Sequence, residues 1–208
     1  MTTSRAIAIR AATIEDAAEI GRIHVAAWRE TYAGLLPPTV LDAQSETRRA
    51  QLWEKVMRAP GRHGTTGIFV AETDHGIAGF GSCGQQRAAA LKSKGHDGEI
   101  STLYVLRAFQ RRRIGSDLMR TMAGALLDDG IRAMSLWVLR ENEGARHFYK
   151  RLGGTLAGVR EETLGQTVLS EVAYHWNALD GLADGRAPED RDNGPQTPHG
   201  AGSGHVIC

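Results

Sequence analysis

A basic run at the start of a predicted helix has the clearest chemical meaning in this sequence. After the strand-like segment Leu103-Tyr104-Val105 comes the run Gln110-Arg111-Arg112-Arg113-Ile114-Gly115-Ser116. The first N–H groups of a helix have no partner within the helix, and the helix dipole adds positive charge there. Gly115 lets a ligand approach the backbone, and arginine side chains bind phosphates in a bidentate manner. The run predicts a pyrophosphate site, although a solvated basic turn or a nucleic-acid patch would show the same composition.

A second motif lies between Arg140 and Gly153. Asn142 is suited to cap a helix with its side chain, and Phe148 and Leu152 recur at helical spacing as expected of core residues. Tyr149 has two interpretations, because a phenol beside Phe148 can pack in the core or can donate a proton at neutral pH.

The two motifs, taken in this order, resemble those of the GNAT acyltransferase superfamily. The resemblance rests on Gln-Arg-Arg-x-Ile-Gly-Ser-x-Leu at 110–118 and on Asn-x-x-Ala-x-x-Phe-Tyr-x-x-Leu-Gly at 142–153. It extends over residues 6–177, and the segments 9–17 and 28–37 are similar to those of small bacterial members. It implies that an acetyl group passes from acetyl-CoA directly to a primary amine of a small molecule, amino acid or peptide.

The resemblance also implies roles for individual residues. Contacts with acetyl-CoA are implied for Leu103, Tyr104 and Val105, whose backbone would pair with pantetheine, and for Gln110, Arg111, Arg112, Arg113, Ile114, Gly115, Ser116 and Asn142. Tyr149 corresponds to the residue that donates a proton to the CoA sulfur. Glu99, which precedes the loop, is the candidate base for the amine, or else a solvated carboxylate at a strand end. Acceptor contacts are implied for the end of the first helix, at Trp28, Arg29, Glu30 and Tyr32.

Two positions depart from the family pattern. Arg113 stands where the phosphate loop usually has its first glycine, and Gly154 stands where an aromatic residue often follows the helix. If Arg113 needs a positive φ, its side chain costs about 1 kcal/mol or more. If its φ is negative, arginine fits and adds a phosphate contact. Two other functions therefore stay open: a module that binds acetyl-CoA without catalysis, and a nucleic-acid-binding protein that uses the arginine run.

Composition limits the class of protein further. A length of 208 residues favours one domain, and a net charge of +1 gives no reason to expect a nucleic-acid or membrane partner. Cys83 and Cys208 cannot form a disulfide framework, and no apolar stretch has the length of a transmembrane helix. Histidine spacing indicates no metal site. We expect a cytoplasmic protein that binds acetyl-CoA, with a homodimer left open.

The elements that must position these motifs form an α/β (α+β-like) domain over 1–180. Hydrophobic periodicity and turn residues predict strands at 6–11, 68–73, 77–85, 99–106, 133–139, 155–164 and 166–176. They predict helices at 13–32, after Ser45, at 114–129 and at 142–152, with Leu52, Trp53 and Val56 facing inward. This order implies a mixed, mainly antiparallel central sheet flanked by helices, as in the GNAT fold. The Gly/Pro-rich segment 181–208 is expected to be a disordered tail.

Overall fold

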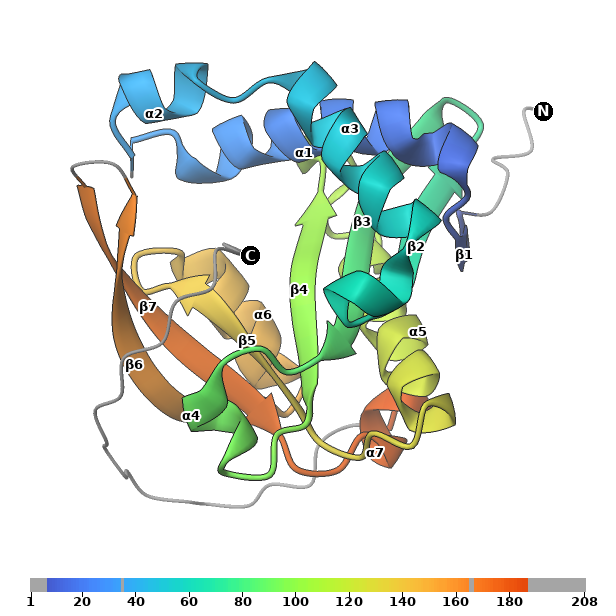
Figure 1. Ribbon diagram of the computed structural model, residues 1–208, viewed down its shortest axis with the longest axis vertical. Helices are drawn as coiled ribbons and strands as arrows, with labels where there is room; N and C mark the ends of the chain where they lie inside the picture. Colours follow the sequence, from blue (N-terminus) through green and yellow to red (C-terminus); the bar gives the residue numbers. More distant parts are fainter. Residues whose placement is uncertain (1–6, 35, 165–166, 187–208) are drawn as a thin grey trace.

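The computed structural model describes residues 7–34, 36–164 and 167–186 (Figure 1). Its strands are β1 (Ala8–Ala11), β2 (Thr65–Thr73), β3 (Gly76–Gln85), β4 (Gly98–Val105), β5 (Met134–Leu139), β6 (Thr155–Leu164) and β7 (Thr167–Trp176). Its α-helices are α1 (Ala17–Tyr32), α2 (Pro38–Asp42), α3 (Glu46–Arg58), α4 (Ala89–Lys92), α5 (Ile114–Asp128), α6 (Glu143–Arg151) and α7 (Asp180–Ala183). Short 3-10 turns are η1 (Ile14–Asp16), η2 (Pro60–His63) and η3 (Arg107–Phe109).

The described strands form one seven-stranded sheet in the order β1-β2-β3-β4-β5-β7-β6. Neighbouring strands are antiparallel except for β4 and β5, which run parallel. The predicted mixed, mainly antiparallel sheet is therefore confirmed. The only parallel pair among these strands joins the two halves of the sheet, and the site described below lies there.

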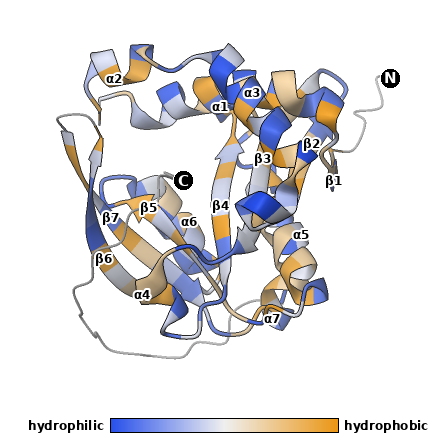
Figure 2. Ribbon diagram, in the orientation of Figure 1, coloured by the Kyte–Doolittle hydropathy of each residue, from blue (hydrophilic) through white to orange (hydrophobic). Residues whose placement is uncertain are grey.

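The helices cover both faces of this sheet. Successive residues of a strand point to opposite faces, and the core divides accordingly. Val70 and Ile77 pack with α1 and α3, whereas their neighbours Ala71 and Ala78 pack with α5, α6 and α7. Hydrophobic and hydrophilic residues alternate along α3 and α5 (Figure 2), as is typical of helices that bury one side.

Helix α3 buries Trp53 and Val56 as the sequence predicts, but not Leu52. Ser45 caps it as expected, because its hydroxyl accepts a hydrogen bond from the Arg48 N–H at 3.3 Å. Trp53 is buried, but Leu52 is 41% exposed, so the inward placement of Leu52 is wrong. The cause is the close approach of α1, since a Cβ on Gly21 would lie 2.6 Å from the Ala50 nitrogen. This contact fixes which side of α3 faces the core.

The end of the domain also differs from the prediction. Helix α7 begins at Asp180, and Leu182 is only 8% exposed within the core cluster that contains α5. The folded part therefore continues past the predicted boundary at 180, to at least Arg186. The predicted tail beyond that point, and the turn predicted at Gly165, lie outside the described residues. In the described part of the chain, every helix is too short or too polar to cross a bilayer.

Candidate active site

The parallel strands β4 and β5 separate soon after they begin to pair. Their ladder joins Gly98 to Met134 and Glu99 to Ser135. On the other side of β4, Ser82 pairs with Thr102 and Cys83 with Ile100, so Ser101 is the extra residue of a β-bulge. The bulge bends β4 away from β5. The edge of β4 near Leu103 consequently faces a cleft instead of another strand.

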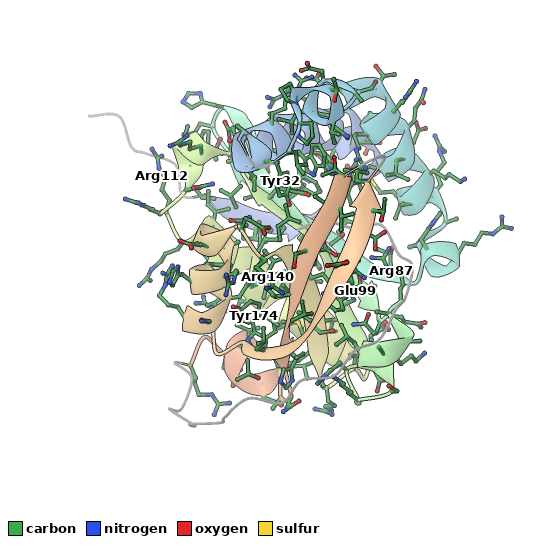
Figure 3. All side chains as sticks on the ribbon, turned by 90° about the vertical axis from the view of Figure 1, so that its left-hand side faces the viewer. Tyr32, Arg87, Glu99, Arg112, Arg140 and Tyr174 are labelled. Carbon is green, nitrogen blue, oxygen red and sulfur yellow. The ribbon has the colours of Figure 1, made fainter. Side chains whose placement is uncertain are left out.

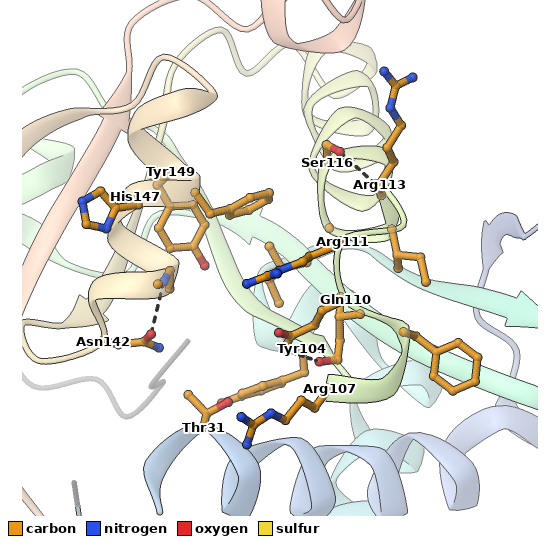
Figure 4. A pocket seen from close by; sticks show the side chains of 18 of the residues that line it. Thr31, Tyr104, Arg107, Gln110, Arg111, Arg113, Ser116, Asn142, His147 and Tyr149 are labelled. Atoms are coloured by element: carbon orange, nitrogen blue, oxygen red, sulfur yellow. Dashed lines mark hydrogen bonds between the residues drawn. The ribbon is translucent and has the colours of Figure 1, made fainter.

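This α5–α6 cleft has a volume of about 1030 Å³. It lies between the start of α5 and helix α6, with β4 at its floor (Figure 4). The residues predicted for the cofactor or for catalysis that line it are Leu103, Tyr104, Val105, Gln110, Arg111, Arg113, Ile114, Gly115, Ser116, Asn142 and Tyr149. Segments far apart in the sequence thus meet as the two motifs require.

The start of α5 has an unusual backbone. Arg111 has φ = 61° and Arg113 has φ = 66°, a left-handed conformation that favours glycine. The Arg113 carbonyl accepts a hydrogen bond from the Ser116 hydroxyl at 2.8 Å. The first amides of α5, including those of Gly115 and Ser116, have no carbonyl partner within the helix. The φ of Arg113 is therefore positive. The arginine stands in place of the usual glycine in a backbone conformation that favours glycine.

The three arginines of the loop point in different directions. In Figure 4 the Arg111 side chain extends into the cleft, whereas that of Arg113 runs away from it along α5. Arg112 does not line the cleft, and its guanidinium carbon lies 5.5 Å from the centre of the Phe109 ring. Figure 3 shows Arg112 projecting outward. Such divergent side chains form no continuous stripe of the kind that follows a nucleic-acid backbone.

Helix α6 supplies the opposite wall. The Asn142 side-chain oxygen accepts a hydrogen bond from the Ala145 N–H at 3.2 Å, so its predicted capping role is confirmed. The Tyr149 ring is 2% exposed, and its hydroxyl points toward the cleft from the side opposite Arg111 (Figure 4). A Cβ on Gly115 would lie 3.2 Å from the Phe148 ring, so glycine at this position also allows α5 and α6 to pack closely.

Glu99 and two residues of α1 lie elsewhere. The Glu99 Oε2 accepts hydrogen bonds from the Arg87 backbone N–H at 3.0 Å and from Arg87 Nε at 3.2 Å. Figure 3 shows this pair on the side of the molecule away from Arg112. Tyr32 is fully buried, with its ring 5.1 Å from that of Trp28, and Arg29 is exposed. Glu99, Arg29 and Tyr32 do not line the α5–α6 cleft, and their predicted roles stay predictions.

Several residues that line the α5–α6 cleft were not predicted from the sequence. They are Thr31, Arg107, Phe109, Gly144, Ala145, His147, Phe148 and Arg151. Arg107 and Arg151 add positive charge to the cleft. The Arg107 backbone N–H donates to Glu30 Oε2 at 2.8 Å, which ties the end of α1 to this wall. Helical spacing identifies Phe148 as apolar, but which neighbours face the cleft depends on the packing of α6.

A second cleft lies on the other side of β4, with a volume of about 690 Å³. We call it the α3–β6 cleft, because α1, α3, β4, β6 and β7 all contribute to its walls. Trp28 lines it, as does Tyr104, which also lines the α5–α6 cleft. The two clefts therefore share a wall residue on β4, beyond the point where its ladder with β5 ends.

His24, which the sequence indicates as a core residue, borders this second cleft. It is 5% exposed, and its Nδ1 accepts a hydrogen bond from Trp53 Nε1 at 3.1 Å. Burial, together with the positive charge of Arg49, lowers the pKa of His24 from 6.5 to about 3. The imidazole is therefore neutral at physiological pH and serves as a hydrogen-bond acceptor in the core.

Comparison with known proteins identifies the family. The model of the acetyltransferase (GNAT) family matches residues 21–154, which is well over half of the chain. The chain belongs to the GNAT acetyltransferase family. It is 28% identical over 177 residues to YuaI of Bacillus subtilis (strain 168), an uncharacterized N-acetyltransferase, covering 85% of this chain and 96% of that protein.

Solved structures of this family have the same fold. The yncA protein of Salmonella typhimurium, a putative acetyltransferase with its cofactor acetyl-CoA, matches with a TM-score of 0.61 and 20% identity over 85% of this chain and 95% of that one. The paia N-acetyltransferase of Thermoplasma acidophilum, in complex with coenzyme A, matches with a TM-score of 0.58 and 21% identity over 80% of this chain and 98% of that one. The predicted fold and family are both confirmed.

Proposed function

We propose that this GNAT protein transfers an acetyl group from acetyl-CoA directly to a primary amine, with the α5–α6 cleft as the cofactor site. The observation that supports this most strongly is the placement of Tyr149 and the start of α5 on opposite walls of one cleft. The related proteins from Salmonella typhimurium and Thermoplasma acidophilum were solved with acetyl-CoA and with coenzyme A.

The residues of the cleft fit each part of acetyl-CoA. The amides at the start of α5 and the Arg111 guanidinium suit the pyrophosphate. The edge of β4 at Leu103 and Val105, which faces the cleft, suits the amides of pantetheine, because an extended chain adds to a sheet edge through main-chain hydrogen bonds. Bound in this way, acetyl-CoA supplies the acetyl group as a thioester beside Tyr149.

The chemical step needs two proton movements that side chains can provide. The amine must lose a proton before it attacks the thioester carbonyl, and the sulfur must gain one as it leaves. Tyr149 donates that second proton from its hydroxyl. Glu99 is the proposed base, and because it lines neither cleft it takes the first proton through water. No covalent acyl-enzyme is required.

Tyr149→Phe tests the assignment of the proton donor. Free thiol released from acetyl-CoA is measured with mixtures of amino acids, polyamines and short peptides. We expect amine-dependent release by the wild type, and a kcat about 100-fold lower for Tyr149→Phe because a positioned acid contributes this much. The Kd for CoA should change little. Equal turnover by the two proteins would contradict the assignment, and tight CoA binding without any turnover would favour a non-catalytic binding module.

A further inference from the structure

Two charged side chains line the α3–β6 cleft with incomplete pairing: an arginine without a carboxylate partner and a carboxylate with one oxygen that accepts no hydrogen bond among the described residues. Four arginines line this cleft: Arg49, Arg62, Arg87 and Arg160. Arg87 is paired with Glu99, and Arg160 is paired with Glu171. Arg49 and Arg62 have no carboxylate partner among the described residues. Arg49 is the more buried of these two.

Arg49 is a partly buried cation with a neutral partner. Its Nε and Nη2 donate to the side-chain oxygen of Gln44 at 3.3 and 2.8 Å. Burial lowers the pKa of the guanidinium, so its charge is incompletely compensated by its surroundings. A charge removed from water is normally paired with an opposite charge, because its loss of hydration is otherwise uncompensated. A cation that lines a cleft in this state is suited to an anionic ligand.

Glu171 is a buried carboxylate of which only one oxygen is hydrogen-bonded within the described part of the chain. Its side chain is fully buried at the centre of β7, and Oε2 accepts a hydrogen bond from Arg160 Nε at 2.6 Å. Arg160 is held in place by the Trp137 ring, whose centre lies 4.2 Å from its guanidinium carbon. The other oxygen, Oε1, has no hydrogen-bond partner among the described residues. A buried carboxylate oxygen without a donor is suited to a hydrogen bond from an amino group, and Glu171 is among the residues that line the cleft.

We infer that the α3–β6 cleft binds the acceptor, and that this acceptor is a small amine with a carboxylate, such as a free amino acid. Arg49 binds the carboxylate, and Glu171 Oε1 accepts a hydrogen bond from the amino group. A volume of about 690 Å³ suits a small molecule. Tyr104 borders both this cleft and the α5–α6 cleft, so the proposal has the amino group meet the thioester beside Tyr104. The inference rests on the proposed acetyl transfer.

The test compares acceptors that differ only in the carboxylate. Free amino acids and their primary amides are assayed at saturating acetyl-CoA. We expect the wild type to prefer the acids, and Arg49→Met to raise KM for the acids by about 10- to 100-fold, because a hydrogen bond to a charged group contributes this much. Arg48→Met is the matched control, since Arg48 is the exposed neighbour on α3 and should keep the preference. Arg49→Lys keeps the positive charge and should therefore retain part of the preference for acids.

Glu171 is tested separately, because its proposed partner is the amino group, which the acids and the amides share. Glu171→Gln should raise KM for acids and amides by the same factor, so the preference for acids stays. Arg49→Met should bring the two KM values together, so the preference is lost. Equal use of acids and amides by the wild type would overturn the inference, as would equal behaviour of Arg49→Met and Arg48→Met. Acetyl-CoA binding with no acetylation of any amino acid would also overturn it. Failure to bind acetyl-CoA would instead remove the proposed function.

Discussion

The two left-handed arginines at the start of α5 allow strain and ligand binding to be measured separately. Arg111 and Arg113 have nearly the same positive φ, but only Arg111 extends into the cleft (Figure 4). A left-handed residue other than glycine costs about 1–2 kcal/mol, and the greater freedom of glycine in the unfolded chain returns about 0.4–1 kcal/mol of this. Arg111→Gly and Arg113→Gly should therefore each stabilise the free protein by about 0.5–1 kcal/mol. For a chain of this size the melting temperature should rise by about 1–4 °C.

Binding should separate the two variants. Arg111→Gly removes a cation facing the proposed pyrophosphate site and should weaken CoA binding by about 10- to 100-fold. Arg113→Gly should leave the Kd within about threefold of the wild type, since its side chain points away. Calorimetric titration with CoA and thermal unfolding measure the two effects.

Arg112 provides the control for this pair. Its φ is not positive, and it is not among the residues that line the cleft. Arg112→Gly should lower the melting temperature, because glycine only adds freedom to the unfolded chain there, and should leave CoA binding unchanged. An Arg113→Gly variant that weakens CoA binding as much as Arg111→Gly would contradict the assigned side-chain directions. Destabilisation of both left-handed positions by glycine, as expected for Arg112, would contradict the strain.

Three further predictions concern the core. Because burial lowers the pKa of His24 to about 3, the folded state binds fewer protons than the unfolded state between pH 6.5 and 3, and stability falls as the pH drops through this window. The loss should reach about 2 kcal/mol near pH 5 in urea melts and should shrink in His24→Gln but not in His75→Gln, whose histidine is exposed. Leu182→Ala should cost about 2–3 kcal/mol if α7 belongs to the core, and a loss below about 0.5 kcal/mol would argue against that. Burial raises the pKa of Cys83 to about 12, so a thiol reagent should modify it in the native protein only at the rate of unfolding, and fast modification would contradict its burial.

Long periodic segments made most of the fold predictable. The strand and helix that frame the phosphate loop, and the helix that carries Tyr149, lie within one or two residues of their predicted bounds. Helices α2, α4 and α7 were missed because each spans only four or five residues, too few for a period to be visible. Leu52 was misplaced because periodicity does not reveal how closely α1 approaches at Gly21.

The site was predictable where backbone conformation or a motif determines it, and less so where tertiary packing does. The α5 start and Tyr149 share a cleft as the motifs indicate. Arg49, Arg160 and Glu171 lie on three different elements, and their spacing in the sequence gives no sign that they meet in one cleft. The Gly154 departure also has a packing reason, since a Cβ there would lie 2.7 Å from the Trp176 ring.

A crystal structure with coenzyme A would show whether the α5–α6 cleft holds the cofactor. We predict that the pyrophosphate lies on the amides of Gly115 and Ser116, pantetheine along β4 beside Leu103 and Val105, and the sulfur within hydrogen-bonding distance of the Tyr149 hydroxyl. Coenzyme A bound outside the α5–α6 cleft, or inside it with the sulfur remote from Tyr149, would contradict it.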